Sequence, residues 1–402
     1  MKKILFVIRE LAGGGAERAL SNIMMHFPKD WEIDLLMNNE DYVEFPYRGN
    51  ILTLDIPEPK NRESIIYQAW VIIKRIWYLR KIKKSNNYTA CISFLDSSNI
   101  ANILSGNKYC KTIVSVRVKI SQDKSFVYQH IVKPLASALY NKADYVVAVA
   151  EGVKKDLVEE LNIQEERVKT ITNGFDVQEI EQQAMQEIED TAILNKLDGK
   201  FVFVSTGRYS FQKAQWHLIR AFSKVSKECE KAHLLLIGKG ADEDYLRNVI
   251  RENNLDDKVT LLSYQKNPFA WLNRCHVFVM PSMFEGYCNA LCEALICGLP
   301  CIATDFQSSA REILAPDTDY TYQVTNGIEY AEYGILTSVC SGIKYKNNEP
   351  LEPAESYLAE AMLTMYSNKE LYEKYRDLAM ERGKQLDINV KVQEWLSLVQ
   401  KE

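Results

Sequence analysis

Short apolar runs alternate with longer segments of helical period through both halves of the chain. This alternation is typical of parallel sheets covered by helices. In the first half the predicted strands are 4–8, 32–37, 90–95, 112–117, 144–149 and 168–172. In the second half they are 201–207, 233–238, 259–263, 277–282, 300–304 and 334–339. The pattern therefore predicts an α/β protein with two doubly wound, Rossmann-like parallel-sheet domains.

Length and local polarity set the expected domain boundaries. A chain of 402 residues suits two domains of ordinary size. The segment 181–199 is charged and low in apolar residues, so we place a linker there, between a first domain at 1–180 and a second at 200–370. The chain has a helical pattern after Pro353, and we expect residues 371–402 to cross back to the first domain.

Charge is distributed unevenly between the two halves. The chain carries a net charge of −5, but residues 1–180 hold 25 Lys and Arg against 22 Asp and Glu, so they carry +3 and the remainder carries −8. A basic half is more consistent with an anionic substrate or surface than with nucleic acid bound along the whole chain. We therefore expect no nucleic-acid partner.

The N-terminal run and the cysteines indicate in which cellular compartment the protein is expected. Only five apolar residues separate Lys3 from Arg9, which suits a buried strand rather than a signal peptide. The sequence also lacks the roughly 18 consecutive apolar residues of a membrane-spanning helix. Nine cysteines without a C-x-x-C pair fit a reducing compartment. These features predict a cytoplasmic protein.

The run EGYCNALCEAL, residues 285–295, follows a predicted strand and begins a predicted helix. Its glutamates Glu285 and Glu293 are eight residues apart, roughly 12 Å along a helix, so they cannot serve one atom together. They suit two hydrogen-bond acceptors along one extended polyhydroxy ligand. The backbone N–H groups of the helix start at 287–289 favour an anionic group between them. A sugar nucleotide has this layout, with hydroxyls on both sides of a diphosphate.

A glycine-rich stretch follows the first predicted strand. Gly13, Gly14 and Gly15 let the backbone pass close to a ligand. Gly13 and Gly15 also have the first spacing of a dinucleotide-binding fingerprint, but its third position falls on Arg18, whose bulk opposes the close helix–strand packing of that motif. Nicotinamide binding and a purely structural turn remain alternatives for this stretch.

Two cations come directly after the first predicted strand of the second half. Ligands of open parallel sheets bind beyond the carboxyl ends of the strands, where Arg208 and Lys213 are expected. Fixed cations at that place stabilise a departing nucleoside diphosphate more in the transition state than in the ground state. We expect both residues in the site together with Glu285. Solvated surface charge is the alternative.

Several stretches together carry a resemblance to a known family. They are GGGAER at 13–18, VAVAEGVKKDL at 147–157, ITNGFD at 171–176, GRYSFQK at 207–213, LLLIGKG at 234–240, the long segment 261–306 and REIL at 311–314. In this order and spacing they resemble the retaining glycosyltransferases of family 4, marked by a Glu-x7-Glu motif. The fold of that family is the GT-B type, in which two Rossmann-like domains face each other across a cleft. The resemblance spans essentially the whole chain.

The resemblance implies roles for individual residues. Arg208 and Lys213 would hold the donor diphosphate, Glu285 would face the donor sugar, and Glu293 would accept from the ribose hydroxyls. Further donor contacts would come from Gly14, Gly15, Gly286, Tyr287, Cys288 and Asn289, and the acceptor side would include Arg117. By their position in the chain, Gln265 and Lys266 are candidates for base recognition, and His130 for an acceptor contact.

Three segments depart from the family pattern. SSAREIL at 308–314 replaces a common Ser-Gly-Pro version, the residue after Arg117 is not the frequent Asn, and Gly174 stands where Pro often precedes Phe-Asp. The departures concern the acceptor side of the expected site more than the donor side.

The resemblance also implies a reaction. The anomeric configuration is kept, and the leaving phosphate oxygen helps to deprotonate the incoming hydroxyl, so Glu285 orients the sugar instead of forming a covalent intermediate. We expect transfer of a hexose or N-acetylhexosamine from a nucleotide sugar, a UDP-sugar above all, to a lipid-linked glycan in the synthesis of capsule, lipopolysaccharide or another cell-surface polysaccharide. A sugar-nucleotide epimerase on the same fold and a non-catalytic sugar-nucleotide-binding subunit are the alternatives.

No metal or other cofactor is expected. The triplets at 242–244 and 317–319 have the carboxylate spacing of a manganese-diphosphate site, but both lie in polar, turn-like surroundings. Arg208, Lys213 and a helix start already offset the phosphate charge. The cysteines around the Glu-x7-Glu motif lie beside apolar residues and are expected to be small core residues rather than zinc ligands.

Residues 62–84 form a candidate helix with an apolar face and a basic end. The apolar face comprises Ile65, Ile66, Ala69, Trp70, Ile73, Ile76 and Trp77, and the basic cluster comprises Lys74, Arg75, Arg80, Lys81, Lys83 and Lys84. This combination suits the interface of an anionic membrane and would place the protein peripherally on the inner face of that membrane. A helix packed on its own sheet with a solvated basic end is the alternative.

Overall fold

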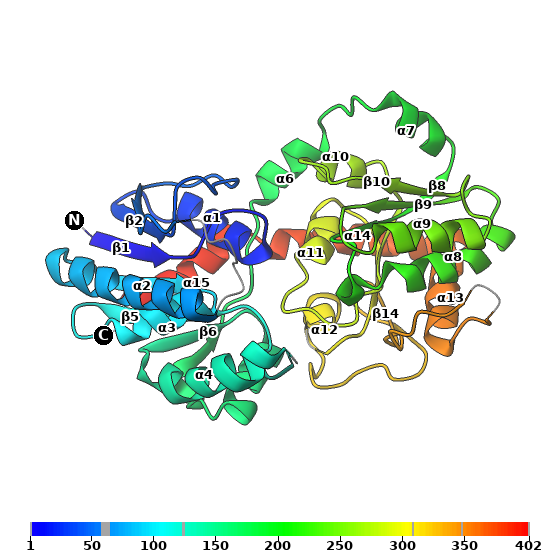
Figure 1. Cartoon of the computed structure of the whole chain (residues 1–402). Coiled ribbons are helices and arrows are strands. Elements are labelled where there is room, and N and C mark those ends of the chain that lie inside the picture. The colour runs from blue at the N-terminus through cyan, green and yellow to red at the C-terminus, as the bar shows by residue number, and fades with distance from the viewer. Residues whose placement is uncertain (1, 58–64, 123–124, 308, 347–348, 401–402) are drawn as a thin grey trace. The chain divides into compact units, whose positions relative to one another are not determined.

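The computed structural model describes residues 2–57, 65–122, 125–307, 309–346 and 349–400 (Figure 1). It divides into two compact units, one comprising Met1–Phe175 and Ile388–Glu402 and the other Asp176–Asp387. Each unit is built on its own seven-stranded sheet with helices packed against it. The prediction of two doubly wound α/β domains is confirmed.

The first unit contains an entirely parallel sheet in the order β3-β2-β1-β4-β5-β6-β7. Its strands are β1 (Lys2–Val7), β2 (Trp31–Met37), β3 (Asn50–Thr53), β4 (Ala90–Phe94), β5 (Lys111–Val116), β6 (Tyr145–Ala148) and β7 (Val168–Thr170). Its α-helices are α1 (Gly15–His26), α2 (Ile65–Ser85), α3 (Asp96–Leu104), α4 (Lys133–Leu139), α5 (Glu151–Lys155) and α15 (Ile388–Gln400). Because the central strands are buried on both faces, they are continuous apolar runs in the sequence.

The second unit contains a sheet in the order β10-β9-β8-β11-β12-β14-β13, parallel except for β13. Its strands are β8 (Phe201–Thr206), β9 (Ala232–Ile237), β10 (Val259–Leu262), β11 (Val277–Met280), β12 (Cys301–Thr304), β13 (Ile328–Tyr330) and β14 (Ile335–Thr337). Its α-helices are α6 (Val177–Ala184), α7 (Thr191–Leu197), α8 (Gln215–Glu228), α9 (Glu243–Glu252), α10 (Phe269–Leu272), α11 (Asn289–Ile296), α12 (Ser309–Leu314), α13 (Pro353–Ser367) and α14 (Lys369–Gln385).

All twelve predicted strands are present, and the described residues contain two others that escaped the sequence pattern. β3 and β13 are edge strands of four and three residues, and none of their residues is fully buried. A short, half-exposed strand carries too little apolar periodicity to be recognised. The pairing of β13 with β14 also requires antiparallel geometry, which apolar periodicity does not specify.

The expected linker at 181–199 belongs to the second unit instead. Helix α6 packs against α10 and α11. Asn267 donates a hydrogen bond to the carbonyl of Gln183 at 2.8 Å, and Asn273 donates one to the carbonyl of Ala184 at 3.1 Å. These bonds fix the segment to the second unit, so the boundary lies after Phe175 rather than at 180.

The C-terminal segment is also divided differently from the expectation for 371–402. Helix α14 belongs to the second unit, where Arg382 donates hydrogen bonds to the carbonyls of Glu312 and Ile313. Only α15 belongs to the first unit, where Trp395 is buried against Phe94 with ring centroids 5.8 Å apart.

The departure from the family pattern at Gly174 has a structural reason. A Cβ atom at this position would lie 2.7 Å from the Cα of Ile388, so the backbone leading to Phe175 approaches α15 too closely for any side chain. The amide of Ile388 donates to the carbonyl of Phe175 at 2.9 Å. The glycine is therefore required by the way in which α15 docks.

Helix α2 has an exposed apolar face but a smaller basic cluster than expected. Ile66, Trp70, Ile73 and Trp77 are exposed, two of them to 83% (Ile66) and 76% (Trp77). Arg75 and Lys83 are buried, however, and Lys83 donates to the carbonyl and side-chain oxygens of Asn102. The two cations therefore do not belong to the solvated basic end, because helical periodicity turns them toward the sheet. Residues 62–64 of the predicted helix lie outside the described residues.

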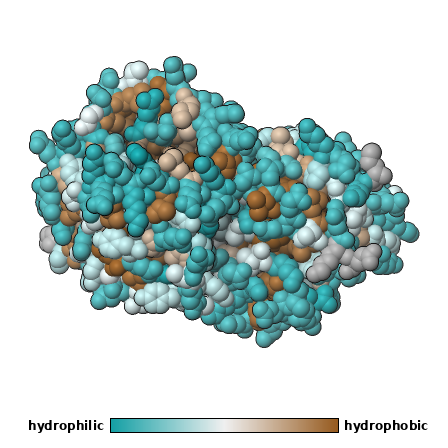
Figure 2. All heavy atoms as spheres, turned by 180° about the vertical axis from the view of Figure 1, so that it is seen from behind, coloured by the Kyte–Doolittle hydropathy of each residue, from teal (hydrophilic) through white to brown (hydrophobic). Residues whose placement is uncertain are grey.

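Hydrophobic residues on the face shown in Figure 2 gather in patches on a mostly hydrophilic surface. Within the described part of the chain, no helix combines the length and the apolar character needed to cross a membrane.

Candidate functional site

The second sheet reverses its strand order between β8 and β11. At such a switch point the connections from two neighbouring strands depart in opposite directions and leave a crevice at the carboxyl edge of the sheet. The loop after β8 carries Arg208 and Lys213, and the loop after β11 carries Glu285. The three residues predicted to be catalytic therefore follow the two strands that flank the switch point.

Lys213 and Glu285 form an ion pair in which Nζ lies 2.6 Å from Oε1. The lysine side chain is 20% exposed and the glutamate side chain 10%. Gln212 donates from Nε2 to the second oxygen of Glu285 at 3.0 Å and to the carbonyl of Phe284 at 2.8 Å. Both carboxylate oxygens are thus held by the loop after β8, which fixes the position of Glu285.

The charge of Lys213 is stabilised by its surroundings. Burial alone would lower its pKa, but Glu285, with smaller contributions from Cys288 and Glu293, raises the pKa above its ordinary value. The lysine therefore stays protonated at neutral pH. An ammonium group has three N–H donors, and the ion pair with Glu285 uses one of them. The others are suited to an anionic ligand.

Glu293 and Arg208 are the other charged residues predicted for the donor site, and their surroundings differ. Glu293 lies on α11, is buried, and contributes to the electrostatic potential at Lys213. Arg208 is exposed, and its side chain makes no hydrogen bond or ion pair to any residue that the structure describes. The structure brings Lys213, Glu285 and Glu293 together and leaves the Arg208 guanidinium on the same loop, accessible to a ligand.

Three glycines allow the loops after β8 and β9 to run in contact. A Cβ atom on Gly238 would lie 2.0 Å from the carbonyl oxygen of Gly207, and one on Gly240 would lie 2.1 Å from that of Tyr209. Gly207 itself has a φ of +150°, which favours glycine. The Tyr209 hydroxyl donates to the carbonyl of Leu236 at 2.8 Å. These contacts set the path of the loop that presents Arg208 and Lys213.

The start of α11 differs in detail from the expected anion site. The amide of Asn289 donates to the carbonyl of Tyr287 at 3.1 Å, so one of the three expected amide donors is already used within the protein. Cys288 is buried, and its Sγ lies 3.0 Å from Oγ of Ser309. Cys288 can therefore meet a ligand only through its backbone, as can Gly286, which has no side chain.

The candidates for base recognition lie after β10. Gln265 donates to the carbonyl of Ser263 and accepts from the indole N–H of Trp271, each at 3.2 Å. Lys266 is exposed. Tyr264, directly before these two candidates, is 61% exposed and has Lys239 5.3 Å from its ring centroid. An exposed aromatic ring at the carboxyl edge of the sheet can stack on a base, whereas the polar atoms of Gln265 are already used.

In the first unit, the predicted glycines precede α1. Gly13 has a φ of +74°, and Gly14 is the N-cap of α1 with extended backbone. A Cβ atom on Gly14 would lie 2.0 Å from a carboxylate oxygen of Glu17. Glu17 is buried, and this burial raises its pKa. Gly14 therefore makes room for a buried carboxylate that the sequence pattern did not identify.

The two acceptor-side candidates have different surroundings. Arg117 follows β5, is 9% exposed, lies 4.6 Å from the ring centroid of Phe94 and donates to Asn173 at 2.9 Å. Its Nε has no hydrogen-bond partner in the described part of the chain, and burial lowers its pKa to about 9, although Glu17 opposes that change. His130 is exposed and stacks on Phe126 at 4.3 Å. Arg117 is thus a buried, incompletely bonded cation, and His130 is a surface residue.

The sequence pattern did not identify two residues that hold other site residues in place. Gln212 holds Glu285, and Asn173 holds Arg117. Both lie inside stretches that carry the family resemblance, GRYSFQK and ITNGFD. Their contacts join segments 73 and 56 residues apart along the chain, so no local pattern could assign them.

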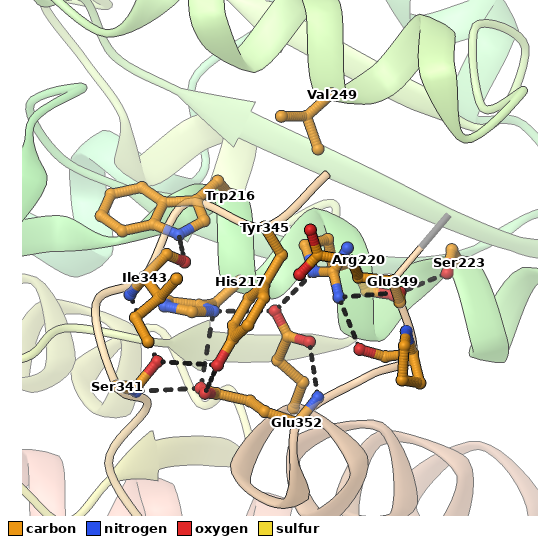
Figure 3. Close-up of polar contacts among 12 residues, drawn as sticks. Trp216, His217, Arg220, Ser223, Val249, Ser341, Ile343, Tyr345, Glu349 and Glu352 are labelled. Carbon is orange, nitrogen blue, oxygen red and sulfur yellow. Dashed lines mark hydrogen bonds and ion pairs between the residues drawn. The ribbon is translucent and has the colours of Figure 1, made fainter. Parts of the chain in front are cut away.

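A buried polar network fixes α8, the helix that begins just after Lys213 (Figure 3). Glu355 accepts from His217 Nδ1 at 2.7 Å and from Arg220 Nε at 2.8 Å. The indole N–H of Trp216 donates to the carbonyl of Ile343 at 3.3 Å. The network ties α8 to α13 and to the segment before it, and so restrains the end of the loop that carries Lys213.

Within the described residues, one group could in principle hold a metal ion: His217, Cys340 and Glu352. Its donor atoms are used inside the protein, because His217 Nε2 accepts from the Gly342 amide at 3.2 Å and Glu352 accepts from the Ser341 amide at 2.9 Å. Burial raises the pKa of the Cys340 thiol well above its usual value. These donors fit a hydrogen-bonded core network better than a metal site.

Of the four cysteines near the Glu-x7-Glu motif, Cys288, Cys292 and Cys301 are buried in the core and Cys297 is partly buried. Burial raises the pKa of Cys292 and of Cys297 to about 12, and that of Cys288 and Cys301 well above the usual value. All four are free thiols. A protonated thiol is a poor metal ligand.

Two family models match successive parts of the chain. The model described as Glycosyltransferase Family 4 matches residues 13–179, and the model described as Glycosyl transferases group 1 matches residues 186–333. An uncharacterized glycosyltransferase of Methanocaldococcus jannaschii is 30% identical over 353 residues, which cover 85% of this chain and 86% of that protein.

A second relative and a solved structure extend over nearly the whole chain. The N-acetylgalactosamine-N,N'-diacetylbacillosaminyl-diphospho-undecaprenol 4-alpha-N-acetylgalactosaminyltransferase of Campylobacter jejuni is 26% identical over 392 residues, 96% of each protein. The crystal structure of Anabaena HepE in complex with UDP and glucose superposes with a TM-score of 0.71 at 18% identity, covering 99% of this chain and 100% of that chain.

The matched ranges agree with the architecture. The family 4 model covers most of the sheet of the first unit, and the group 1 model covers the loops that carry Arg208, Lys213 and Glu285 and the helix that carries Glu293. The predicted GT-B architecture, with one Rossmann-like sheet in each domain, is confirmed. The chain belongs to the glycosyltransferases, with a family 4 domain followed by a group 1 domain.

Proposed function

We propose that this glycosyltransferase transfers a hexose or N-acetylhexosamine from a UDP-sugar to a lipid-linked glycan, with retention of the anomeric configuration, in the synthesis of a cell-surface polysaccharide. The observation that carries the proposal is the ion pair of Lys213 and Glu285 at the switch point of the second sheet, with the Arg208 guanidinium exposed on the same loop. HepE, which shares the fold, was crystallised with UDP and glucose.

The charges of the site suit a sugar diphosphate. Arg208 has a full set of donors for the phosphate oxygens, and Lys213 has donors that Glu285 does not use. Glu285 then lies next to the anionic group, where its carboxylate can accept from sugar hydroxyls and stabilise positive charge that develops on the sugar ring. Glu293, buried on α11, can accept from the ribose hydroxyls.

In the proposed reaction, the bond between the anomeric carbon and the leaving phosphate oxygen breaks. The acceptor hydroxyl forms the new bond on the same face of the sugar, and its proton passes to the departing phosphate. Arg208 and Lys213 stabilise the charge that accumulates on that phosphate, so the site needs no divalent metal for this purpose.

The exposed face of α2 supports a lipid-linked acceptor. Ile66, Trp70, Ile73 and Trp77 recur at helical spacing and are all exposed, and Arg80 lies exposed nearby. An apolar stripe with aromatic residues beside cations suits the interface of an anionic membrane, which would hold the enzyme peripherally on that surface. The C. jejuni relative is named for an acceptor linked through diphosphate to undecaprenol.

Substitutions at the donor site test the proposal. With a panel of nucleotide sugars and EDTA present, we expect Glu285→Gln to lower the transfer rate about a hundredfold with little loss of donor affinity, because the carboxylate acts mainly in the transition state. Arg208→Ala should weaken both donor binding and transfer, because the guanidinium binds the phosphate in both states. Arg274→Ala, at another exposed arginine of the second unit, is the matched control.

Product analysis separates the possible activities. Retained transfer by Glu285→Gln would overturn the role of this residue, and loss of transfer in EDTA would show that a metal is needed. Turnover of the nucleotide sugar to its epimer without any acceptor would identify an epimerase. Binding of nucleotide sugar without turnover in the presence of acceptor glycans would identify a non-catalytic subunit.

A further inference from the structure

A cavity of about 370 Å³ lies at the switch point of the first sheet. The strand order of this sheet changes direction between β1 and β4. Residues that follow β1, β2 and β4 line the cavity, among them Arg9, Asn38 and Ser97, and α2 forms another wall. The cavity therefore occupies the place at which a doubly wound sheet binds its ligand.

Arg75 lies in the wall that α2 contributes, and it is only 1% exposed. Its Nη2 donates to the side-chain oxygen of Asn38 at 2.7 Å, and its Nη1 donates to the hydroxyl of Ser97 at 3.2 Å. Among the described residues, its Nε has no hydrogen-bond partner. The two partners that these residues provide for Arg75 are neutral, so they include no counter-ion for this buried guanidinium.

The electrostatic surroundings of Arg75 are positive. Burial, with a smaller contribution from the positive charge of Arg9, lowers its pKa to about 10, and no carboxylate of the described residues acts in the opposite direction. The guanidinium still stays charged at neutral pH. An unpaired charge buried in a protein costs several kcal/mol in general, so such a group is normally matched by an opposite charge. A bound anion would supply that charge here.

The two acids among the described residues of the cavity wall have partners within the protein, and one of these partners is Arg9. Asp96 accepts from the hydroxyls of Tyr128 and Tyr140, each at 3.0 Å, and Glu10 lies 3.9 Å from Arg9. The remaining wall includes several apolar side chains. These are Ile56, Val71, Ile72, Leu95, Val127 and Val132. A ligand of this cavity therefore combines an anionic group with an apolar portion.

We propose that this cavity binds the phosphoryl group of an amphiphilic ligand through Arg75, with Arg9 as a second cation. Guanidinium groups bind phosphate oxygens by paired, charge-assisted hydrogen bonds, and the free Nε of Arg75 supplies one such donor. The assignment of the ligand to the lipid-linked acceptor rests on the proposed function. The existence of the anion site does not.

Calorimetric titration of the full-length protein tests the site with three probes: octyl phosphate, inorganic phosphate and octyl glucoside. Arg75→Met removes the charge but keeps an unbranched side chain, and Arg274→Met makes the same change at an exposed arginine of the second unit. We expect Arg75→Met to weaken the binding of octyl phosphate about tenfold or more and Arg274→Met to leave it unchanged. Equal binding by Arg75→Met and the native protein would overturn the proposal.

The probes separate the sources of the phosphate and the two candidate anion sites. Octyl glucoside binding as tightly as octyl phosphate would overturn an anion site. Inorganic phosphate binding as tightly as octyl phosphate would overturn the assignment to a lipid-linked acceptor. Loss of phosphate binding in Arg208→Ala, but not in Arg75→Met, would place the anion at the donor site and overturn the proposal.

Two further measurements distinguish loss of the anion site from misfolding of the Arg75 variant and from failure of the proposed function. Arg9→Gln changes a side chain that is 48% exposed, so the variant should fold normally. We expect its affinity for octyl phosphate to fall about threefold or more. Unchanged affinity in Arg9→Gln would overturn the role of Arg9. Hydrolysis of the nucleotide sugar should persist in Arg75→Met while transfer to the acceptor falls, whereas loss of both would point to the donor site.

Discussion

Lys213 and Glu285 meet across two loops of the second unit, with Nζ 2.6 Å from Oε1, although 72 positions separate them in the chain. The lysine ends the loop after β8, and the glutamate lies in the loop after β11. Because β8 and β11 are neighbours in the sheet, the pair joins the two sides of the switch point. It links a group expected to bind phosphate to one expected to face the sugar.

The pair should be energetically coupled. Lys213→Met leaves the mostly buried carboxylate without its cation, so we expect the free energy of unfolding to fall by about 1–3 kcal/mol. Glu285→Gln should also destabilise, and the double variant should lose less than the sum of the two single losses. Urea unfolding of the four proteins gives the coupling energy, and simple additivity would contradict a direct interaction.

Gly238→Ala should displace the loop that carries Arg208. A new Cβ atom would lie 2.0 Å from a backbone oxygen, which cannot move as the end of a side chain can. We expect a loss of about 2 kcal/mol or more in stability, together with weaker donor binding. Gly199→Ala is the control, because Gly199 has a φ of +64° but no atom within 4 Å of its added Cβ. It should cost about 1 kcal/mol and leave donor affinity intact.

His233 should make the second unit sensitive to acid. It is buried beside Thr260, with 2.9 Å between Nε2 and Oγ1, and burial lowers its pKa to about 4. The unfolded chain takes up a proton below pH of about 6.5, whereas the folded chain does so only near pH 4. The unfolded state therefore binds more protons in this window, and stability falls as pH drops from 6.5 to 4.

Protonation of His233 should lower the free energy of unfolding by on the order of 2–3 kcal/mol as the pH falls from 6.5 to 4. Thermal unfolding of the native protein and of His233→Gln, followed from pH 7.5 to pH 4, measures it. The variant should lose much of the pH dependence. His130→Gln, at an exposed histidine, should retain it, and parallel curves for the native protein and His233→Gln would refute the assignment.

The exposed stripe on α2 should bind anionic vesicles. We expect the double variant Trp70→Ser with Trp77→Ser to cosediment at least tenfold more weakly with vesicles that contain phosphatidylglycerol, because two exposed indoles no longer enter the interface. Added salt should weaken the binding of the native protein to these vesicles, since the cations of α2 contribute to that binding. Met185→Ser, at another exposed apolar residue, is the control. Equal sedimentation of all three proteins would show that the stripe does not contact lipid.

Apolar periodicity was sufficient to predict most of the fold. Each buried parallel strand is a continuous apolar run, and each run was recognised, because both faces of the strand are covered. The edge strands β3 and β13 were missed for the opposite reason, since half-exposed strands of three or four residues carry little pattern. The boundary near 180 was misplaced because α6 is polar on one side and docks through hydrogen bonds from Asn267 and Asn273.

The sequence by itself determined which residue types follow the strands β8 and β11, and so named Arg208, Lys213, Glu285 and Glu293. It also determined the apolar stripe on 62–84. Only the tertiary structure decided that Lys213 and Glu285 form a pair, that Gln212 holds the carboxylate, and that Arg75 turns inward to a cavity. Parallel strands that are neighbours in space are distant along the chain, and local periodicity carries no information about which of their loops will meet.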